Sequence, residues 1–186
     1  MRRFILKKTA INDLLVIERN PLRDNRGYFE RLFCDTELEE ILKNRKIAQI
    51  NHSRTKQKGT VRGMHYHPPP FSEMKIVSCL RGEVFDVAVD LRRNSSTFLH
   101  WHSEVLSETN HRSIAIPEGF AHGFQTLTKE CELIYLHTAT YKPEAQAGLN
   151  ALDPLLAIDW PLSITECSPR DQSHSMLSPN FSGISL

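Results

Sequence analysis

The chain has 186 residues, of which 40% are hydrophobic and 24% are charged, the size and composition of one ordinary globular domain. Its formal net charge of +1 argues against a surface that binds nucleic acid or an anionic membrane. The sequence has no apolar run near the roughly 20 residues of a membrane-spanning helix, and its start lacks the apolar stretch of a signal peptide, so we expect a cytoplasmic protein.

Strands dominate the expected secondary structure. Short runs of apolar residues recur along the chain and are separated by glycines, prolines and polar turns. The expected strands cover residues 14–18, 48–52, 60–65, 75–80, 83–91, 98–106, 113–116, 120–127 and 132–141. One short helix is expected at 36–44, because Thr36 and Glu39 have the spacing of a capping box.

Residues 83–91 show the clearest alternation. Apolar residues with odd numbers alternate with Asp86 and Asp90, so one face is apolar and the other carries two carboxylates. Many short strands with intervening turns are typical of an all-β sandwich or barrel, and a jelly roll protects the strand edges. We therefore expect a single domain over residues 1–186, with a few short helices and an irregular tail from about residue 162.

The densest polar cluster is RGMHYH at residues 62–67, which three prolines follow. On an ideal strand His65 and His67 point to one face, whereas Arg62 points to the other. If the histidine face lines the interior of a barrel, two imidazoles reach one cavity. A hydrogen-bonded core histidine is the structural alternative for either residue alone.

Later strands carry further polar and aromatic candidates. His122 follows a turn that contains Pro and Gly, so it either enters the same cavity or lies on a surface hairpin. Tyr135 and Tyr141 are six residues apart on the expected strand 132–141 and therefore share a face. A phenol can transfer protons when its pKa is tuned, so these tyrosines and Lys75 are candidates for acid–base chemistry, with core packing as the alternative.

The sequence resembles one known enzyme family. Residues 61–70, VRGMHYHPPP, resemble the R-G-[LM]-H-Y-Q-x-P-P signature of the dTDP-4-dehydrorhamnose 3,5-epimerase family. Further similar blocks lie at residues 24–29, 49–53, 75–77, 82–92, 96–98, 106–107, 116–124, 141–143 and 153–161. The resemblance spans about residues 12–172, nearly the whole chain.

The resemblance implies a cupin-type jelly roll that forms a homodimer with strand exchange. It implies a nucleotide-sugar substrate, such as dTDP-4-dehydro-6-deoxyglucose, whose C3 and/or C5 centres are inverted without a cofactor to give dTDP-4-dehydrorhamnose. A proton beside a ketone is acidic because the resulting anion spreads onto the carbonyl oxygen, so such an enzyme needs a base, an acid and a cation near that oxygen.

The resemblance also implies residue roles. His65 is expected to be the general base, and Asp171 in the SPRD motif is expected to orient it. Tyr135 is expected to return a proton on the opposite face of the ring, and Lys75 to stabilise the enolate oxygen. The residues expected to bind the substrate, partly across the dimer interface, are Arg26, Gln49, Asn51, Arg62, His122, Tyr141 and Arg170.

Departures from the family pattern keep alternatives open. His67 stands where the family usually has Gln. Many cupins hold a divalent metal through His-x-His, a following Glu and a later His, a set represented here by His65, His67, Glu73 and His122. Other departures near the expected ligand contacts leave open a mono-epimerase that acts on a different nucleotide sugar. A binding protein without catalysis is a third alternative, against which the presence of all four expected catalytic residues argues.

Overall fold

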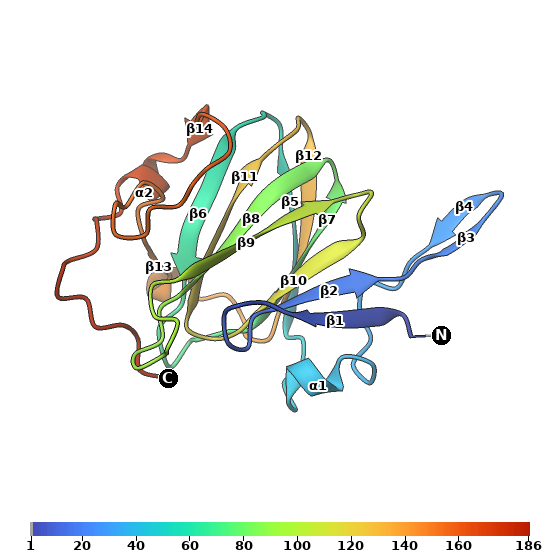
Figure 1. The fold of residues 1–186 in the computed structure, drawn as a ribbon, viewed down its shortest axis with the longest axis horizontal. Coiled ribbons are helices and arrows are strands. Elements are labelled where there is room, and N and C mark those ends of the chain that lie inside the picture. Colours follow the sequence, from blue (N-terminus) through green and yellow to red (C-terminus); the bar gives the residue numbers. More distant parts are fainter. Residues whose placement is uncertain (1) are drawn as a thin grey trace.

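The computed structural model describes residues 2–186 and shows two mainly antiparallel sheets that face each other (Figure 1). In spatial order, the first sheet contains β1 (Phe4–Lys8), β2 (Leu15–Arg19), β10 (Arg112–Ile116), β7 (Lys75–Arg81), β12 (Cys131–His137) and β5 (Gln49–Thr55). The second contains β13 (Ala147–Gly148), β6 (Thr60–Tyr66), β11 (Phe120–Thr126), β8 (Glu83–Asp90) and β9 (Trp101–Ser107), and β14 (Glu166–Cys167) runs parallel beside β6.

The remaining elements are short. β3 (Leu22–Asp24) and β4 (Gly27–Phe29) form a hairpin that projects from the body of the molecule (Figure 1). The helices are α1 (Glu39–Leu42), the 3₁₀ helix η1 (Pro143–Ala145) and α2 (Pro169–Gln172). This arrangement confirms the expected fold class, a jelly-roll sandwich with a few short helices. Within residues 2–186, every helix falls short of the length and apolarity that a membrane crossing requires.

All nine strands that the sequence predicts are present, with ends that shift by a few residues. The largest shift is at 132–141, where β12 ends at His137, so the prediction that Tyr141 lies on this strand is wrong. β1, β3, β4, β13 and β14 were not predicted, because short strands and strands with charged outer residues carry little alternation.

The predicted helix at 36–44 is shorter than expected. α1 has four residues, its N-cap is Leu38 and no side chain caps it. The Thr36 hydroxyl instead lies 3.1 Å from a neighbouring cysteine sulfur, so the predicted capping box is wrong. The helix depends on packing, because its Ile41 and Leu42 are buried in an apolar cluster with residues of the first sheet.

Three apolar clusters hold the layers together. The interior of the sandwich is filled from both sheets, for example by Val77 and Leu133 of the first and Val84 and Phe124 of the second. A second cluster joins the first sheet to α1. The third lies between the second sheet and the tail, which contributes Phe181. Burying each large apolar side chain contributes about 1.5–3 kcal/mol, so the tail is anchored over the sheet that carries β6 and β11.

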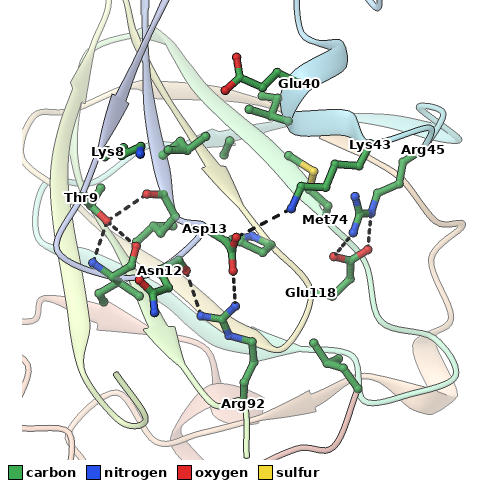
Figure 2. A pocket seen from close by; sticks show the side chains of 17 residues that line it. Lys8, Thr9, Asn12, Asp13, Glu40, Lys43, Arg45, Met74, Arg92 and Glu118 are labelled. Carbon is green, nitrogen blue, oxygen red and sulfur yellow. Dashed lines mark hydrogen bonds and ion pairs between the residues drawn. The ribbon is translucent and has the colours of Figure 1, made fainter. Parts of the chain in front are cut away.

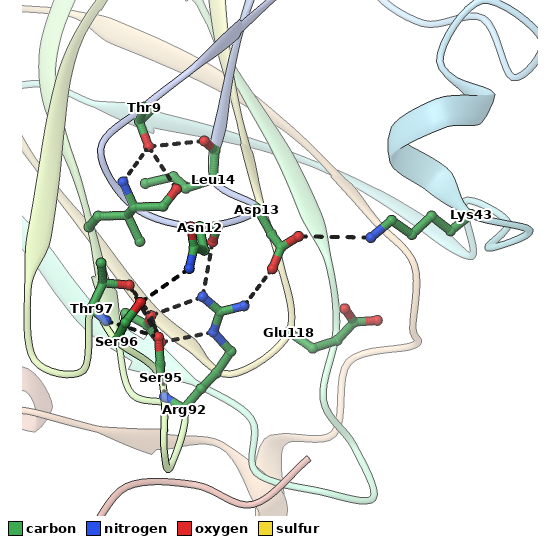
Figure 3. A network of polar contacts seen from close by, with 12 residues as sticks. Thr9, Asn12, Asp13, Leu14, Lys43, Arg92, Ser95, Ser96, Thr97 and Glu118 are labelled. Atoms are coloured by element: carbon green, nitrogen blue, oxygen red, sulfur yellow. Dashed lines mark hydrogen bonds and ion pairs between the residues drawn. The ribbon is translucent and has the colours of Figure 1, made fainter.

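β8 is buried on both faces, and its two carboxylates point into the interior. Asp86 and Asp90 are both fully buried, so each needs a partner to offset desolvation. Asp90 accepts hydrogen bonds from Arg92, with Nη2 2.9 Å from Oδ2. Arg92 also donates to Asp13 over 2.8 Å and lies 4.7 Å from the Phe120 ring centroid. Figure 3 shows how this network ties the β1–β2 loop to the end of β8.

A cavity of about 780 Å³ lies between the β1–β2 loop and α1 (Figure 2). Several of its charged groups are paired with one another, as in Arg45 with Glu118, where Nη2 and Oε2 are 2.8 Å apart. None of the predicted site residues lines it. The chemistry predicted from the sequence therefore lies elsewhere in the fold.

Candidate active site

Two adjoining cavities collect most of the predicted site residues. The central cavity, about 500 Å³, is lined among others by Asn51, Ser53, Arg62, His65, His67, Glu73, Lys75, His122, Tyr135, His137, Tyr141 and Gln146. The outer cavity, about 520 Å³, is lined among others by Arg54, Arg62, His65, Ser168, Arg170 and Asp171. The two cavities meet at Arg62 and His65, which line both.

A bulge in β6 brings Arg62 and His65 to the same side. His65 pairs with His122 on β11. Arg62, three residues earlier, pairs with Phe124, which is only two residues further on. Gly63 lies inside this bulge with φ of 126°, and a Cβ there would lie 2.5 Å from the backbone of β11. The expectation from ideal alternation, that Arg62 points away from His65, is therefore wrong.

His65 and Asp171 form a hydrogen-bonded dyad. His65 Nε2 lies 2.7 Å from Asp171 Oδ1, and the Gly63 amide donates to Oδ2 over 3.2 Å. α2 holds the carboxylate in place, because Ser168 Oγ accepts a hydrogen bond from the Asp171 amide over 3.0 Å. The His65 side chain is 29% exposed and that of Asp171 only 5%, so the imidazole faces the cavities and the carboxylate lies behind it.

Asp171 remains ionised in this setting. Burial alone would raise the pKa of Asp171, but the hydrogen bond and charge of His65, with the Gly63 amide, outweigh burial and lower that pKa below its ordinary value. A fixed carboxylate behind an imidazole selects one tautomer and supports the imidazolium form. The dyad therefore has the chemistry of a general base.

A buried carboxylate, Glu73, contacts a lysine and two imidazoles of the central cavity. Glu73 lies 3.2 Å from Lys75 Nζ and accepts a hydrogen bond from His137 Nδ1 over 2.9 Å. Burial alone would raise the pKa of Glu73, but His137 and Lys75 lower it to about 2. His67 Nδ1 is 3.4 Å from the same carboxylate, and neither His67 ring nitrogen has a hydrogen-bond partner within residues 2–186. His67 and Lys75 both line the central cavity beside this carboxylate.

His122 and Tyr135 lie on facing sheets beside this cluster. His122 Nε2 donates to the buried Asp86 carboxylate, with nitrogen–oxygen distances of 2.9 and 3.0 Å. Its ring centroid is 6.3 Å from that of Tyr135. The Tyr135 hydroxyl hydrogen-bonds Ser53 over 3.1 Å. Burial raises the pKa of Tyr135 above its ordinary value, so the phenol is protonated at neutral pH and can donate a proton.

Asn51 and Tyr141 line the central cavity, whereas Gln49 does not line it and contacts both of them. Gln49 donates to Asn51 over 2.9 Å and accepts a hydrogen bond from the Tyr141 amide over 3.0 Å. Tyr141 lies in the loop after β12, and its ring centroid is 5.6 Å from that of His67. The two tyrosines therefore do reach one cavity, although not on one strand.

Of the three arginines predicted to bind the substrate, two line the cavities and one does not. Arg62 lines both cavities, and Arg170 in α2 lines the outer one. Arg26 lies at the turn of the β3–β4 hairpin, where its side chain is 90% exposed and pairs with Asp24 over 2.6 Å. The structure of the single chain does not bring Arg26 to the cavities, because the hairpin projects away from the body (Figure 1).

The four residues of the metal-dependent alternative do not form one ligand set. His65 is held by Asp171, His122 by Asp86, and Glu73 by Lys75 and His137. Within residues 2–186, three side chains of the metal-binding types His, Cys, Asp and Glu have ligand atoms that all lie within 4.8 Å of one another. They are His65, Asp171 and His174. His67, Glu73 and His122 are absent from that group.

Sequence reasoning missed three residues of the site. His137 lies two residues after Tyr135 on β12, so a period of two would have placed it on the same face. Ser53 lies directly opposite β12 on β5, where it pairs with Leu133. His174 follows α2 by two residues in the tail, and no local pattern indicates that it returns to the dyad.

Comparisons with known proteins identify the family of the chain. The sequence model of the dTDP-4-dehydrorhamnose 3,5-epimerase family matches residues 8–179. The dTDP-4-dehydrorhamnose 3,5-epimerase of Salmonella typhimurium is 40% identical over 176 residues, which are 93% of this chain and 95% of that one. The dTDP-4-dehydrorhamnose 3-epimerase of Streptomyces niveus is 38% identical and covers 92% of this chain and 83% of its own length.

A solved structure shows the same fold. The dTDP-6-deoxy-D-glucose-3,5-epimerase of Legionella pneumophila, in complex with dTDP-4-keto-L-rhamnose, is similar with a TM-score of 0.88. It is 41% identical to this chain, and the match covers 93% of this chain and 92% of that one. The family match and the shared fold both extend over nearly the whole sequence. The chain therefore belongs to the dTDP-4-dehydrorhamnose 3,5-epimerase family.

Proposed function

We propose that this protein is an isomerase that inverts C3 and C5 of dTDP-4-dehydro-6-deoxyglucose and so forms dTDP-4-dehydrorhamnose. One observation carries the proposal: His65 on β6 and Tyr135 on β12 belong to opposite sheets and line one cavity. Inversion needs a base on one face of the sugar ring and a proton donor on the other. A sugar bound between the two sheets has one group on each side.

His65 acts as the base. Its Nε2–H donates to Asp171, so the neutral ring carries its lone pair on Nδ1. Nδ1 takes the proton from the carbon beside the 4-keto group, and the imidazolium that forms is stabilised by the ionised Asp171. A neutral imidazole is a suitable base at physiological pH.

Lys75 and His122 stabilise the enolate. The Lys75 ammonium is buried and pairs directly with Glu73, and it supplies a positive charge where the 4-keto oxygen gains a negative one. His122, fixed by Asp86, lies on the opposite wall. Preorganised donors in a cavity that excludes water stabilise such charge more strongly than water does.

Tyr135 returns the proton. Its raised pKa keeps the phenol protonated, and an enolate carbon on the other side of the ring is basic enough to accept that proton. The Ser53 hydroxyl, 3.1 Å from the phenol oxygen, fixes the direction in which the phenol points. Inversion follows because the proton leaves on the His65 side and returns on the Tyr135 side.

The nucleotide occupies the outer cavity, which has three arginines among its lining residues: Arg54, Arg62 and Arg170. A diphosphate is bound well by such groups. The solved relative from Legionella pneumophila holds a dTDP-sugar, which supports the same ligand class here. Asn51 and Tyr141 line the sugar side, and Gln49 holds both of them through hydrogen bonds.

We further propose a homodimer with strand exchange, in which the β3–β4 hairpin of each subunit carries Arg26 to its partner's site. The support is the projection of this hairpin and the exposure of Leu22, Tyr28 and Phe29 on it. Large apolar side chains on a projecting hairpin are typical of an element that packs on another surface. The protein is proposed to act in the cytoplasm without a cofactor.

Solvent exchange tests the proposed reaction. The protein is incubated with dTDP-4-dehydro-6-deoxyglucose in deuterated water, and NMR follows deuterium at C3 and C5 together with the ring configuration. Deuterium at both carbons with inversion supports double epimerisation. Absence of deuterium at both carbons would refute the proposal.

A 3-epimerase is the second candidate, because the Streptomyces niveus relative is named for inversion at C3 alone. The same experiment separates the two. Deuterium and inversion confined to C3 would identify a mono-epimerase. Deuterium at both carbons with inversion at only one would mean that both carbons lose a proton, and that at one of them the new proton returns on the original face.

A further inference from the structure

His174 lies next to the dyad without a part in the proposed reaction. Its ring centroid is 6.3 Å from that of His65, and the ring planes are 75° apart. The backbone there is fixed, because Asn150 Nδ2 donates to the His174 carbonyl over 3.1 Å. His174 Nε2 is buried and has no hydrogen-bond partner within residues 2–186. A buried nitrogen without a partner is costly unless it receives one, so it is poised to bind a ligand.

Gly148 makes room for this ring. β13 pairs with β6 so that Gly148 lies opposite His65. A Cβ at Gly148 would lie 2.1 Å from His174 Nε2, far inside van der Waals contact. The glycine thus lets the imidazole reach the back of the dyad, where a larger residue would displace it.

His65, Asp171 and His174 each offer one ligand atom, and these atoms lie within 4.8 Å of one another. Two imidazoles and one carboxylate are a common ligand set for Zn²⁺ and related divalent ions. Ligands around a tetrahedral zinc ion are roughly 3.3 Å apart, so small side-chain rotations are enough to close the group around an ion. His65 and Asp171 both line the outer cavity, which leaves a further coordination position open to water.

We propose that His65, Asp171 and His174 form an inhibitory site for Zn²⁺. The ion takes the Nε2 lone pair of His65 on the side of Asp171, and the ring proton moves from Nε2 to Nδ1, so that the imidazole stays neutral. With zinc on Nε2 and a proton on Nδ1, the imidazole has no free lone pair with which to accept the proton of the sugar carbon. The inhibition rests on the proposed epimerase function, whereas the binding of the metal does not.

Metal binding is measured first, without substrate. The protein is freed of metal with a chelator and titrated with Zn²⁺ by calorimetry, and with Co²⁺ by visible absorption. We expect one ion per chain and the intense visible bands of tetrahedral cobalt. Loss of a residue that only hydrogen-bonds a metal ligand typically weakens metal affinity by about 10–100-fold. Loss of a ligand itself is expected to cost at least as much, so we expect His174→Gln to reduce zinc affinity at least about tenfold.

Two other variants sharpen the comparison. Gly148→Ala keeps all three donors and pushes the His174 ring away, so we expect it to weaken binding as well. If His174→Gln does not fold, Gly148→Ala replaces it as the test of the site. His100→Gln is the matched control, because His100 is exposed in the loop before β9, and we expect its affinity to equal that of the wild type.

Inhibition is then measured as the ratio of proton exchange with and without Zn²⁺ in each protein, which removes differences in basal activity. We expect the zinc concentration for half inhibition to rise at least about tenfold in His174→Gln and to stay unchanged in His100→Gln. Absence of zinc binding, or equal inhibition of the wild type and His174→Gln, overturns the proposal. An inactive protein that binds one ion through His174 would refute the epimerase function and leave the site in place.

Discussion

His137 stacks on Tyr135, with ring centroids 6.1 Å apart and ring planes 21° apart. His137 Nδ1 donates to Glu73 over 2.9 Å, and Asn51 lies 3.4 Å from the other ring nitrogen. The proposed acid is therefore supported by a ring that is fixed at both ends. Glu73 also holds Lys75, so one buried carboxylate positions groups on both the acid and the enolate side.

Replacing Glu73 by Gln is expected to destabilise the fold at neutral pH. The fold lowers the pKa of Glu73 from 4.5 to about 2, which corresponds to stabilisation on the order of 3 kcal/mol. This contribution is fully present above the unfolded-state pKa of 4.5 and is lost as the pH falls through about 2. Urea unfolding of wild type and variant at pH 7 and pH 3 measures the difference.

The expected result is a larger difference in the free energy of unfolding at pH 7 than at pH 3. Glu40→Gln is the control, because Glu40 is exposed on α1 and its substitution is expected to have little effect. A difference for Glu73→Gln that is the same at both pH values would mean that the variant acts through packing and not through charge.

His65→Asn is expected to lower the rate of exchange at the sugar carbon by about 100-fold or more, because general base catalysis contributes on that scale. The amide keeps a donor for Asp171 but has no basic nitrogen. Deuterium incorporation at C3 and C5 by NMR is the measurement. Activity close to that of the wild type would remove His65 from the role of base.

Tyr135→Phe is expected to separate exchange from inversion. The base still removes a proton and solvent deuterium still returns on the same side, but the donor on the opposite face is missing. We expect deuterium to enter the substrate while the inverted product falls about 100-fold or more. Equal loss of exchange and inversion would contradict the assignment of Tyr135 as the acid.

Gly63→Ala tests the bulge that joins the two cavities. Gly63 has φ of 126°, and an added Cβ would lie 2.5 Å from the backbone of β11. Gly27 offers a matched control, since its φ is 130° and a Cβ there meets no atom of residues 2–186 within 4 Å. Backbone strain costs on the order of 1–3 kcal/mol in either variant, so thermal unfolding is expected to show a clearly larger loss for Gly63→Ala. Equal losses would show that the close approach of β6 and β11 is not rigid.

Much of the fold was predictable because a strand leaves a local pattern in the sequence, in which apolar and polar residues alternate between turn residues. Alternation and turn residues located every long strand of both sheets, and two histidines at i and i+2 correctly predicted a shared cavity wall. The position of Arg62 was not predictable, since a bulge that inserts one residue depends on the partner strand β11. Tyr141 reaches the cavity from a loop, which the strand pattern could not show.

The site itself depends on long-range contacts that a single sequence does not display. Asp171 reaches His65 from 106 positions away through α2, and the resemblance to a family, not the local pattern, pointed to this pair. The sequence pattern offers Glu73 as a metal ligand, whereas in the structure its carboxylate is held by Lys75 and His137. The difference is physical, because a carboxylate that already holds a cation and an imidazole has little capacity left for an ion.

The proposed exchange of hairpins predicts that two inactive variants restore each other. Arg26→Ala removes a charged contact, so we expect a loss of about 10–100-fold in kcat/KM, the scale of 1.5–3 kcal/mol for hydrogen bonds to charged groups. His65→Asn is inactive in its own site but still supplies Arg26 to its partner. After the two variants are unfolded and refolded together, half of the dimers are mixed, and each mixed dimer contains one intact site. Activity is therefore expected to return to about a quarter of the wild-type value, whereas no recovery would place Arg26 in its own subunit's site or outside the reaction.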